Sequence, residues 1–177
     1  MGWTRKYELE FKGLKEGLHE FDYEVKDEFF EHFDQGLLDK GELSVKVTLE
    51  KRNTFLHLDF YIEGWVELVC DRCLEKYKQS LIHKDDIFVK FSETEQQNDE
   101  KVLWLCTGEH SVNLAQLIYE FIIVSIPLKH IHPEDENGDS ICNKEMIRKI
   151  EKYTRHEKVN NETDPRWAVL KDIQKNN

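Results

Sequence analysis

The strongest constraint on the fold is a run of alternating apolar and polar side chains between residues 42 and 70. From residue 43 to residue 49 every odd position is Leu or Val, and the even positions between them are polar. After a turn near Asn53 the apolar side chains take the even positions, and they resume beyond Gly64. A period of two is typical of a strand with one face in the core. The pattern predicts long antiparallel strands with a bulge at Gly64.

Shorter patterns predict the elements on either side of these strands. Asp27 can cap a brief helix that Gly36 would end, and the acidic segment 92–100 predicts an exposed loop. The middle of the chain is therefore predicted to be an antiparallel β-meander. Four more segments are expected to contain strands, the last of them short and buried: residues 7–11, 18–25, 77–91 and 102–106.

The hydrophobic period changes to that of a helix in the last third of the chain. Asn113 can cap a helix, and Gln116 three residues later can complete a capping box. This helix must end shortly before Pro127, because the residue before a proline is disfavoured in a helix. Two further helices are expected, one over residues 144–155 and one that begins at Asp164. Together the elements predict an α+β fold, an antiparallel β-meander with helices mainly in the C-terminal third.

Length and charge narrow the class of protein. A chain of 177 residues has the length of one domain, and we expect residues 1–177 to form it. The 36 acidic residues outnumber the 25 basic ones, which excludes a generic basic RNA-binding protein, so any contact with nucleic acid must use a local patch. The N-terminal residues lack the apolar region of a secretory signal, and no apolar run approaches the roughly 20 residues of a membrane span. We expect a cytoplasmic protein without membrane contact.

Cys70 and Cys73 give the sharpest local signal, a C-x-x-C pair at the end of a predicted strand. Two thiols at this spacing can bind one tetrahedral metal ion, because a tight turn sets their separation. A closed zinc site needs two more ligands, and the loop after the first C-terminal helix offers His130, His132 and Cys142. We predict the ligand set Cys70, Cys73, His132 and Cys142.

The same pair has two other interpretations. Cys70 can be simply the last inward residue of its strand, with Cys73 an ordinary loop thiol. Alternatively, the pair can serve a cytoplasmic thiol-disulfide oxidoreductase, which needs a cysteine at a helix N-terminus, where the dipole lowers the thiol pKa. The segment after Cys73 can be read as a helix, but the pair lies in a predicted meander rather than in the βαβ unit that such enzymes use.

A basic stripe is the second candidate site. Four basic side chains are spaced to share one face of the helix over residues 144–155, and such a stripe can follow the phosphates of a nucleic acid. The alternative is an ordinary solvated helix, because Glu145 and Lys149 are four residues apart in the favourable order. The stripe consists of Lys144, Arg148, Lys152 and Arg155.

No motif points to catalysis or to a small-molecule substrate. The chain lacks a glycine-rich phosphate loop, a G-x-S-x-G elbow and an H-E-x-x-H pair. Tryptophan rings can stack on bases, but three of the four lie in apolar patterns and are expected in the core or half-buried. We therefore expect a non-catalytic protein. The four are Trp3, Trp65, Trp104 and Trp167.

Three segments carry a resemblance to a known family. Residues 47–75 end in the box C-D-R-C-L-E, residues 112–135 place Pro127 and a histidine-containing loop after a helix, and residues 164–173 begin with D-P-R. In this order, over residues 47–173, they resemble the YceD family, also called the large ribosomal RNA subunit accumulation proteins.

The resemblance implies a role in the accumulation of large-subunit ribosomal RNA, through processing, stability or subunit assembly, with no catalytic activity. The implied partner is the precursor of that RNA or a protein of the large ribosomal subunit. Many members carry further cysteines after the proline-histidine segment, in pairs suited to a metal. This chain has only Cys142 there, with His130 and His132, so the resemblance implies a mixed ligand set.

Overall fold

The structure is a computed structural model that describes residues 2–33, 37–94, 97, 99, 101–135, 138 and 140–154. The helix predicted to begin at Asp164, and Arg155 of the basic stripe, lie outside the described residues. No helix in the described part is long and apolar enough to cross a membrane.

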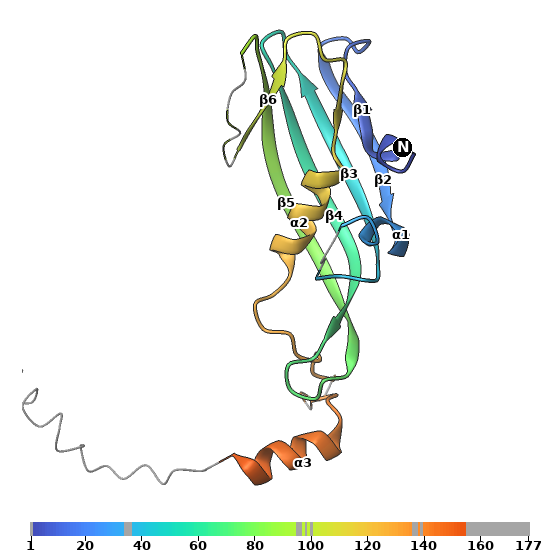
Figure 1. Ribbon diagram of the computed structural model, residues 1–177, viewed down its shortest axis with the longest axis vertical. Helices are drawn as coiled ribbons and strands as arrows, with labels where there is room; N and C mark the ends of the chain where they lie inside the picture. The colour runs from blue at the N-terminus through green and yellow to red at the C-terminus, as the bar shows by residue number, and fades with distance from the viewer. Residues whose placement is uncertain are drawn as a thin grey trace, which may run out of the picture.

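A five-stranded sheet forms the body of the molecule, in the order β2-β3-β4-β5-β6 (Figure 1). The first four strands, β2 to β5, are antiparallel to one another, which confirms the predicted meander. β6 pairs in parallel with the end of β5, and it is half-buried rather than buried. The alternation of apolar residues shows which face a side chain takes but not which way a strand runs, so it could not predict the parallel pairing of β6. The strands are β2 (Gly17–Val25), β3 (Gly41–Lys51), β4 (Phe55–Val69), β5 (Lys76–Ser92) and β6 (Val102–Cys106).

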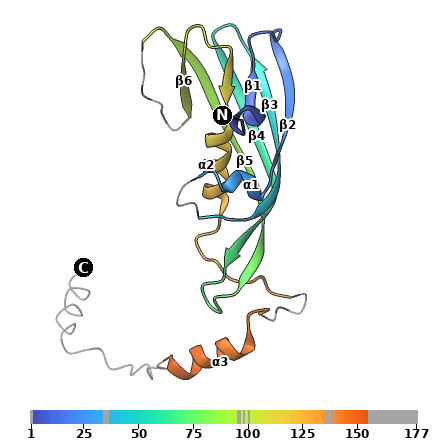
Figure 2. The ribbon, with the colours of Figure 1, turned by 45° about the vertical axis from the view of Figure 1, so that its right-hand side comes forward.

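The smaller elements lie on one face of this sheet (Figures 1 and 2). A two-stranded ribbon pairs β1 (Glu8–Glu10) with β7 (Ser111–Asn113), so it joins two segments that are far apart in the sequence. Three short helical elements accompany it: the 3-10 helix η1 (Thr4–Tyr7), α1 (Asp27–Phe30) and α2 (Ala115–Ser125). The opposite face carries no helix in the described chain. An α+β fold with its longer helices late in the chain is thereby confirmed.

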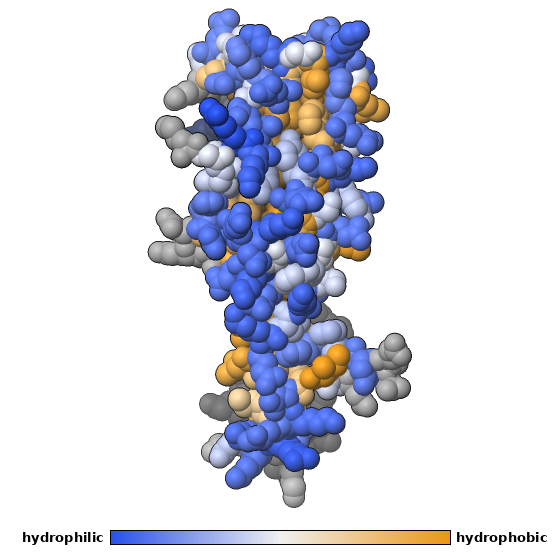
Figure 3. Space-filling model, turned by 90° about the vertical axis from the view of Figure 1, so that its right-hand side faces the viewer, coloured by the Kyte–Doolittle hydropathy of each residue, from blue (hydrophilic) through white to orange (hydrophobic). Residues whose placement is uncertain are grey.

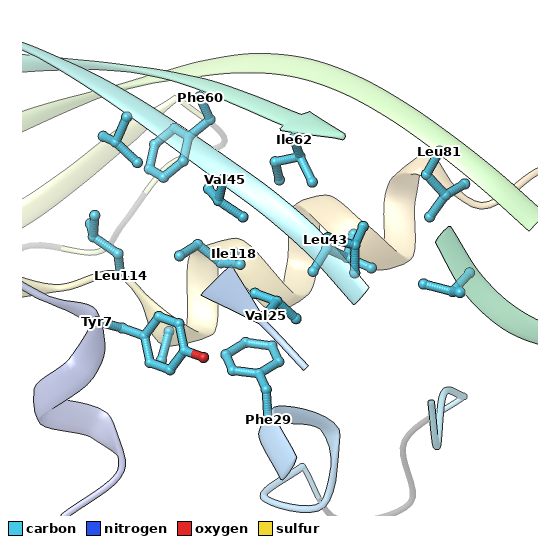
Figure 4. Packing of buried hydrophobic residues seen from close by; sticks show 14 of the residues in the cluster. Tyr7, Val25, Phe29, Leu43, Val45, Phe60, Ile62, Leu81, Leu114 and Ile118 are labelled. Carbon is cyan, nitrogen blue, oxygen red and sulfur yellow. The ribbon is translucent and has the colours of Figure 1, made fainter. Parts of the chain in front are cut away.

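The core lies between the sheet and α2. Leu114, Ile118 and Ile122 have no exposed surface, and Figure 4 shows Leu114 and Ile118 facing the inward residues of the central strands. Phe121 packs edge to face on Phe60 of β4, with the ring centroids 5.0 Å apart. The apolar residues of α2 recur with the period of a helix, so they form one face, and this face packs on the sheet.

Two predicted helix caps differ in detail. The carboxamide of Asn113 accepts from the amide of Ala115 at 3.0 Å, but Gln116 donates to Glu120, so the reciprocal capping box does not form. Asp27 does not cap α1, because its carboxylate accepts from the amide of Gly41 at 2.9 Å. In both cases a tertiary or neighbouring polar group competes successfully with the local cap.

Gly64 is not a bulge. β4 pairs one to one with β3 and β5 through this position, and the inward phase is the same before and after it. A Cβ at Gly64 would lie 2.2 Å from the carbonyl oxygen of Glu42 and 2.6 Å from the Cα of Leu43. The glycine therefore permits a close approach of two backbones rather than an inserted residue.

The sheet narrows toward one end. β3 begins opposite Val66, so beyond that residue only β4 and β5 continue, as a two-stranded arm. Figure 3 shows one side of the molecule as largely hydrophilic, with hydrophobic residues at the surface near the broad end and again where the molecule narrows. The arm ends in the turn at residues 70–75, which contains the C-x-x-C pair.

Candidate metal centre and basic helix

The turn between β4 and β5 holds the two paired cysteines inward. The amide of Cys70 donates to the carbonyl of Glu75 at 2.9 Å, and the amide of Leu74 donates to the carbonyl of Cys70 at 2.9 Å. Leu74 has a φ of 61°, a left-handed conformation that is costly for a leucine and that closes the turn. Cys70 and Cys73 are both buried as a result.

The loop after α2 is fastened to this turn by hydrogen bonds. The amide of Asp71 donates to the carbonyl of His130 at 2.7 Å, and the amide of His130 donates back to the Asp71 carboxylate at 2.8 Å. Farther along, the side chain of Asn143 donates to Glu75 at 2.6 Å. These contacts bring the second half of the predicted ligand set against the first.

The predicted ligand set comes together in space. Sγ of Cys70 lies 3.7 Å from Sγ of Cys142, and Nδ1 of His132 lies 3.3 Å from Sγ of Cys73 and 3.7 Å from Sγ of Cys142. All four donor atoms are within 4.8 Å of one another. His130, the alternative histidine, is not in this group and contributes its backbone to the turn instead. We call Cys70, Cys73, His132 and Cys142 the thiol-imidazole cluster.

The spacing of the cluster fits a tetrahedral zinc ion. Zinc bonds of about 2.3 Å to sulfur and 2.0–2.1 Å to nitrogen place two sulfur ligands about 3.8 Å apart, and a sulfur and a nitrogen about 3.6 Å apart. Three of the six separations between the four donor atoms, at 3.3–3.7 Å, are close to these values, and all six are within 4.8 Å. Three thiols and one imidazole also form a donor set that zinc favours. The cluster could therefore hold a metal ion without rearranging its backbone.

Local electrostatics prepare one thiol for binding. Burial raises the pKa of the Cys70 thiol, but hydrogen bonds from three backbone amides and from the His132 imidazole outweigh it and lower the pKa to about 6. Burial raises the pKa of Cys142, and the adjacent Cys70 adds to this, against a lowering contribution from Ser140. The cluster thus favours one thiolate at neutral pH, which is the form that binds a metal.

The geometry does not supply what the oxidoreductase interpretation requires. The segment after Cys73 is the strand β5, so neither thiol of the pair stands at the N-terminus of a following helix. Cys106, the fourth cysteine, is exposed on β6 and is not in the cluster.

The basic stripe follows directly on the cluster. α3 (Lys144–Tyr153) begins two residues after Cys142, and the Asn143 carboxamide caps it by accepting from the amides of Glu145 and Met146. Lys144, Arg148 and Lys152 are exposed on this helix, and we call them the basic face of α3. The expected ion pair between Glu145 and Lys149 forms, at 3.0 Å. Neither residue belongs to the basic face, so this pair does not neutralise the charge of that face.

Comparison with known proteins identifies a family. Residues 58–174 match a family described as "Large ribosomal RNA subunit accumulation protein YceD". Neither the curated proteins nor the solved structures contain a match.

Proposed function

The chain belongs to the YceD family, and from this membership we propose that it is a non-catalytic factor for the accumulation or processing of large-subunit ribosomal RNA. The observation that carries the proposal is the family match, which covers residues 58–174 and includes most of β4 and all of β5, α2 and α3. We propose that the protein acts in the cytoplasm, as a single domain. Its partner is the precursor RNA or a protein of the large subunit.

The thiol-imidazole cluster supports a structural role for zinc in this function. Four protein ligands complete a tetrahedron, and a closed site leaves no position for the water or substrate that a catalytic zinc needs. The ion would join the tip of the β4–β5 arm to the loop before α3. Its effect would be to fix the start of α3 relative to the sheet.

The basic face of α3 is the RNA contact that we propose. Lys144 lies only two residues beyond Cys142, so the metal site and the cap at Asn143 set the direction in which the helix leaves the molecule. Lysine and arginine on one face can neutralise successive phosphates, and each neutralised phosphate releases counterions. The chain as a whole carries a net charge of −11, so a contact with RNA depends on a local basic patch such as this one.

Complementation in cells tests this proposal. Depletion of the protein should lower the ratio of large- to small-subunit ribosomal RNA, and the wild-type chain should restore it. A variant with Lys144→Glu, Arg148→Glu and Lys152→Glu should fail to restore it. An unchanged RNA ratio on depletion would refute the function, and full rescue by the variant would refute the role of α3. The matched control reverses three exposed lysines elsewhere, Lys12, Lys15 and Lys129, and should rescue.

A further inference from the structure

The face of the sheet opposite α2 carries a row of aromatic rings, each with a lysine over it. Nζ of Lys78 lies 3.6 Å from the centroid of the Trp65 ring, and Nζ of Lys84 lies 5.2 Å from that of Tyr61. The third such pair on this face is Lys90 over Trp104, at 5.8 Å. We call these six residues the aromatic-lysine track.

The track runs along the sheet in a regular manner. Its three lysines are six residues apart on β5, and at about 3.3 Å per residue this spacing places neighbouring lysines about 20 Å apart. A further ring lies between Lys84 and Lys90 on this strand: Phe88 stacks on His57 of β4, with the ring centroids 4.4 Å apart. All of these rings are half-buried, so each keeps part of its surface accessible. No described helix covers them (Figures 1 and 2).

The lysines of the track carry charge that no described carboxylate neutralises. Several acidic side chains on this face have other partners: Glu67 pairs with Lys76 at 2.7 Å, and Asp86 pairs with Lys101 at 2.8 Å. Glu63 accepts from the hydroxyl of Tyr61 at 2.8 Å. In the described part of the chain, Lys78, Lys84 and Lys90 form no ion pair. Three cations on aromatic rings are therefore available for an anionic partner.

We infer that the aromatic-lysine track binds single-stranded RNA. Bases stack on exposed aromatic rings whatever their sequence, while lysines along the same path contact phosphates. The long lysine side chains can move from a ring to a phosphate as a base takes their place. The inference deepens the proposed function and rests on it, since it assigns the RNA partner a second surface besides α3. An acidic peptide would use the lysines but would have little need for the rings.

Anisotropy measurements on the full chain test the track. The probe is a fluorescein-labelled single-stranded oligoadenylate of 12 nucleotides. Loss of one stacking ring should weaken binding roughly 5- to 150-fold, so Trp65→Ala and Tyr61→Ala should each show a loss of this size. Trp65→Phe keeps a ring and should restore most of the affinity, which separates stacking from any effect on folding.

The charge of the track is tested in the same assay. Replacement of Lys78, Lys84 and Lys90 by Gln should weaken binding and reduce its dependence on salt. The same replacement at Lys12, Lys15 and Lys129 should change little. The expected result is a loss in both the ring and the lysine variants of the track, with the control unaffected.

Three outcomes would overturn the track. Loss in the lysine variant alone would indicate an anionic partner recognised by charge, such as an acidic peptide. Equal binding by all variants would place the RNA contact elsewhere, and absence of binding by the wild-type chain would show that the chain alone does not bind single-stranded RNA. None of these results alters the RNA ratio measured on depletion in cells, so failure of the track and failure of the proposed function are distinguishable.

Discussion

Binding of one zinc ion should raise the stability of the whole fold. The ligands Cys70 and Cys142 are 72 positions apart in the chain, so an unfolded chain does not hold the cluster together. A ligand that binds only the native state stabilises it by about 2.7 kcal/mol at 100 times its Kd, and by about 4.1 kcal/mol at 1,000 times. For a chain of this size, 1 kcal/mol corresponds to roughly 2–4 °C in Tm. Zinc should therefore raise Tm by about 5–15 °C.

Thermal unfolding with and without a chelator measures this effect. The wild-type chain should bind one zinc ion and show the shift, and Cys142→Ser should lose most of both. Cys106→Ser is the matched control, because Cys106 is exposed and outside the cluster, and it should behave as the wild type does. An equal Tm with and without zinc, or an equal shift in the Cys142 variant, would refute the assignment of the ligands.

Further predictions concern the sheet and its core. Ile118→Ala removes a side chain with no exposed surface and should cost about 2–5 kcal/mol in the free energy of unfolding, measured in urea; a cost below 1 kcal/mol would contradict the packing of α2. Gly64→Ala should lower Tm markedly, because its Cβ would meet the backbone of β3 at 2.2 Å, and an unchanged Tm would contradict that close approach. Hydrogen bonds from Lys101 lower the pKa of both Asp85 and Asp86, so their contribution to stability is present above about pH 4 and is lost as the pH falls through the lowered pKa values. Lys101→Met should therefore lower the free energy of unfolding at pH 7 and do so progressively less below pH 4; a cost independent of pH would rule out this ionic origin.

The strands were predictable because each is half-buried along its length. A period of two in residues 43–62 places every second side chain in the core, and the structure has β3 and β4 in that phase. The parallel pairing of β6 was not predictable, since strand direction depends on how the loop before it runs. The supposed bulge at Gly64 was wrong although the evidence was present, because an inserted residue would have shifted the phase of the residues after it.

The candidate metal site was predictable from donor chemistry. The C-x-x-C pair needed two more ligands, and the loop after α2 held the few imidazole and thiol groups that could meet it. The choice of His132 over His130 depended on hydrogen bonds between Asp71 and the loop backbone, which no local pattern encodes.

The aromatic rings of the outer sheet face also left a signal. Tyr61 and Trp65 occupy odd positions of β4, the phase that the polar side chains take, so their rings belong on the outer face. The tryptophans were expected in the core or half-buried, and Trp3, Trp65 and Trp104 are half-buried. Their pairing with lysines of β5 depends on strand register, which the sequence does not state.

Crosslinking in growing cells tests the central claim most directly. The tagged chain is captured after crosslinking, and the RNA and proteins bound to it are identified. The account predicts enrichment of large-subunit precursor RNA, or of early assembly proteins of that subunit, with RNA recovery reduced in the Lys144, Arg148 and Lys152 charge-reversal variant. Recovery of thiol-bearing proteins without ribosomal RNA or ribosomal proteins would contradict it.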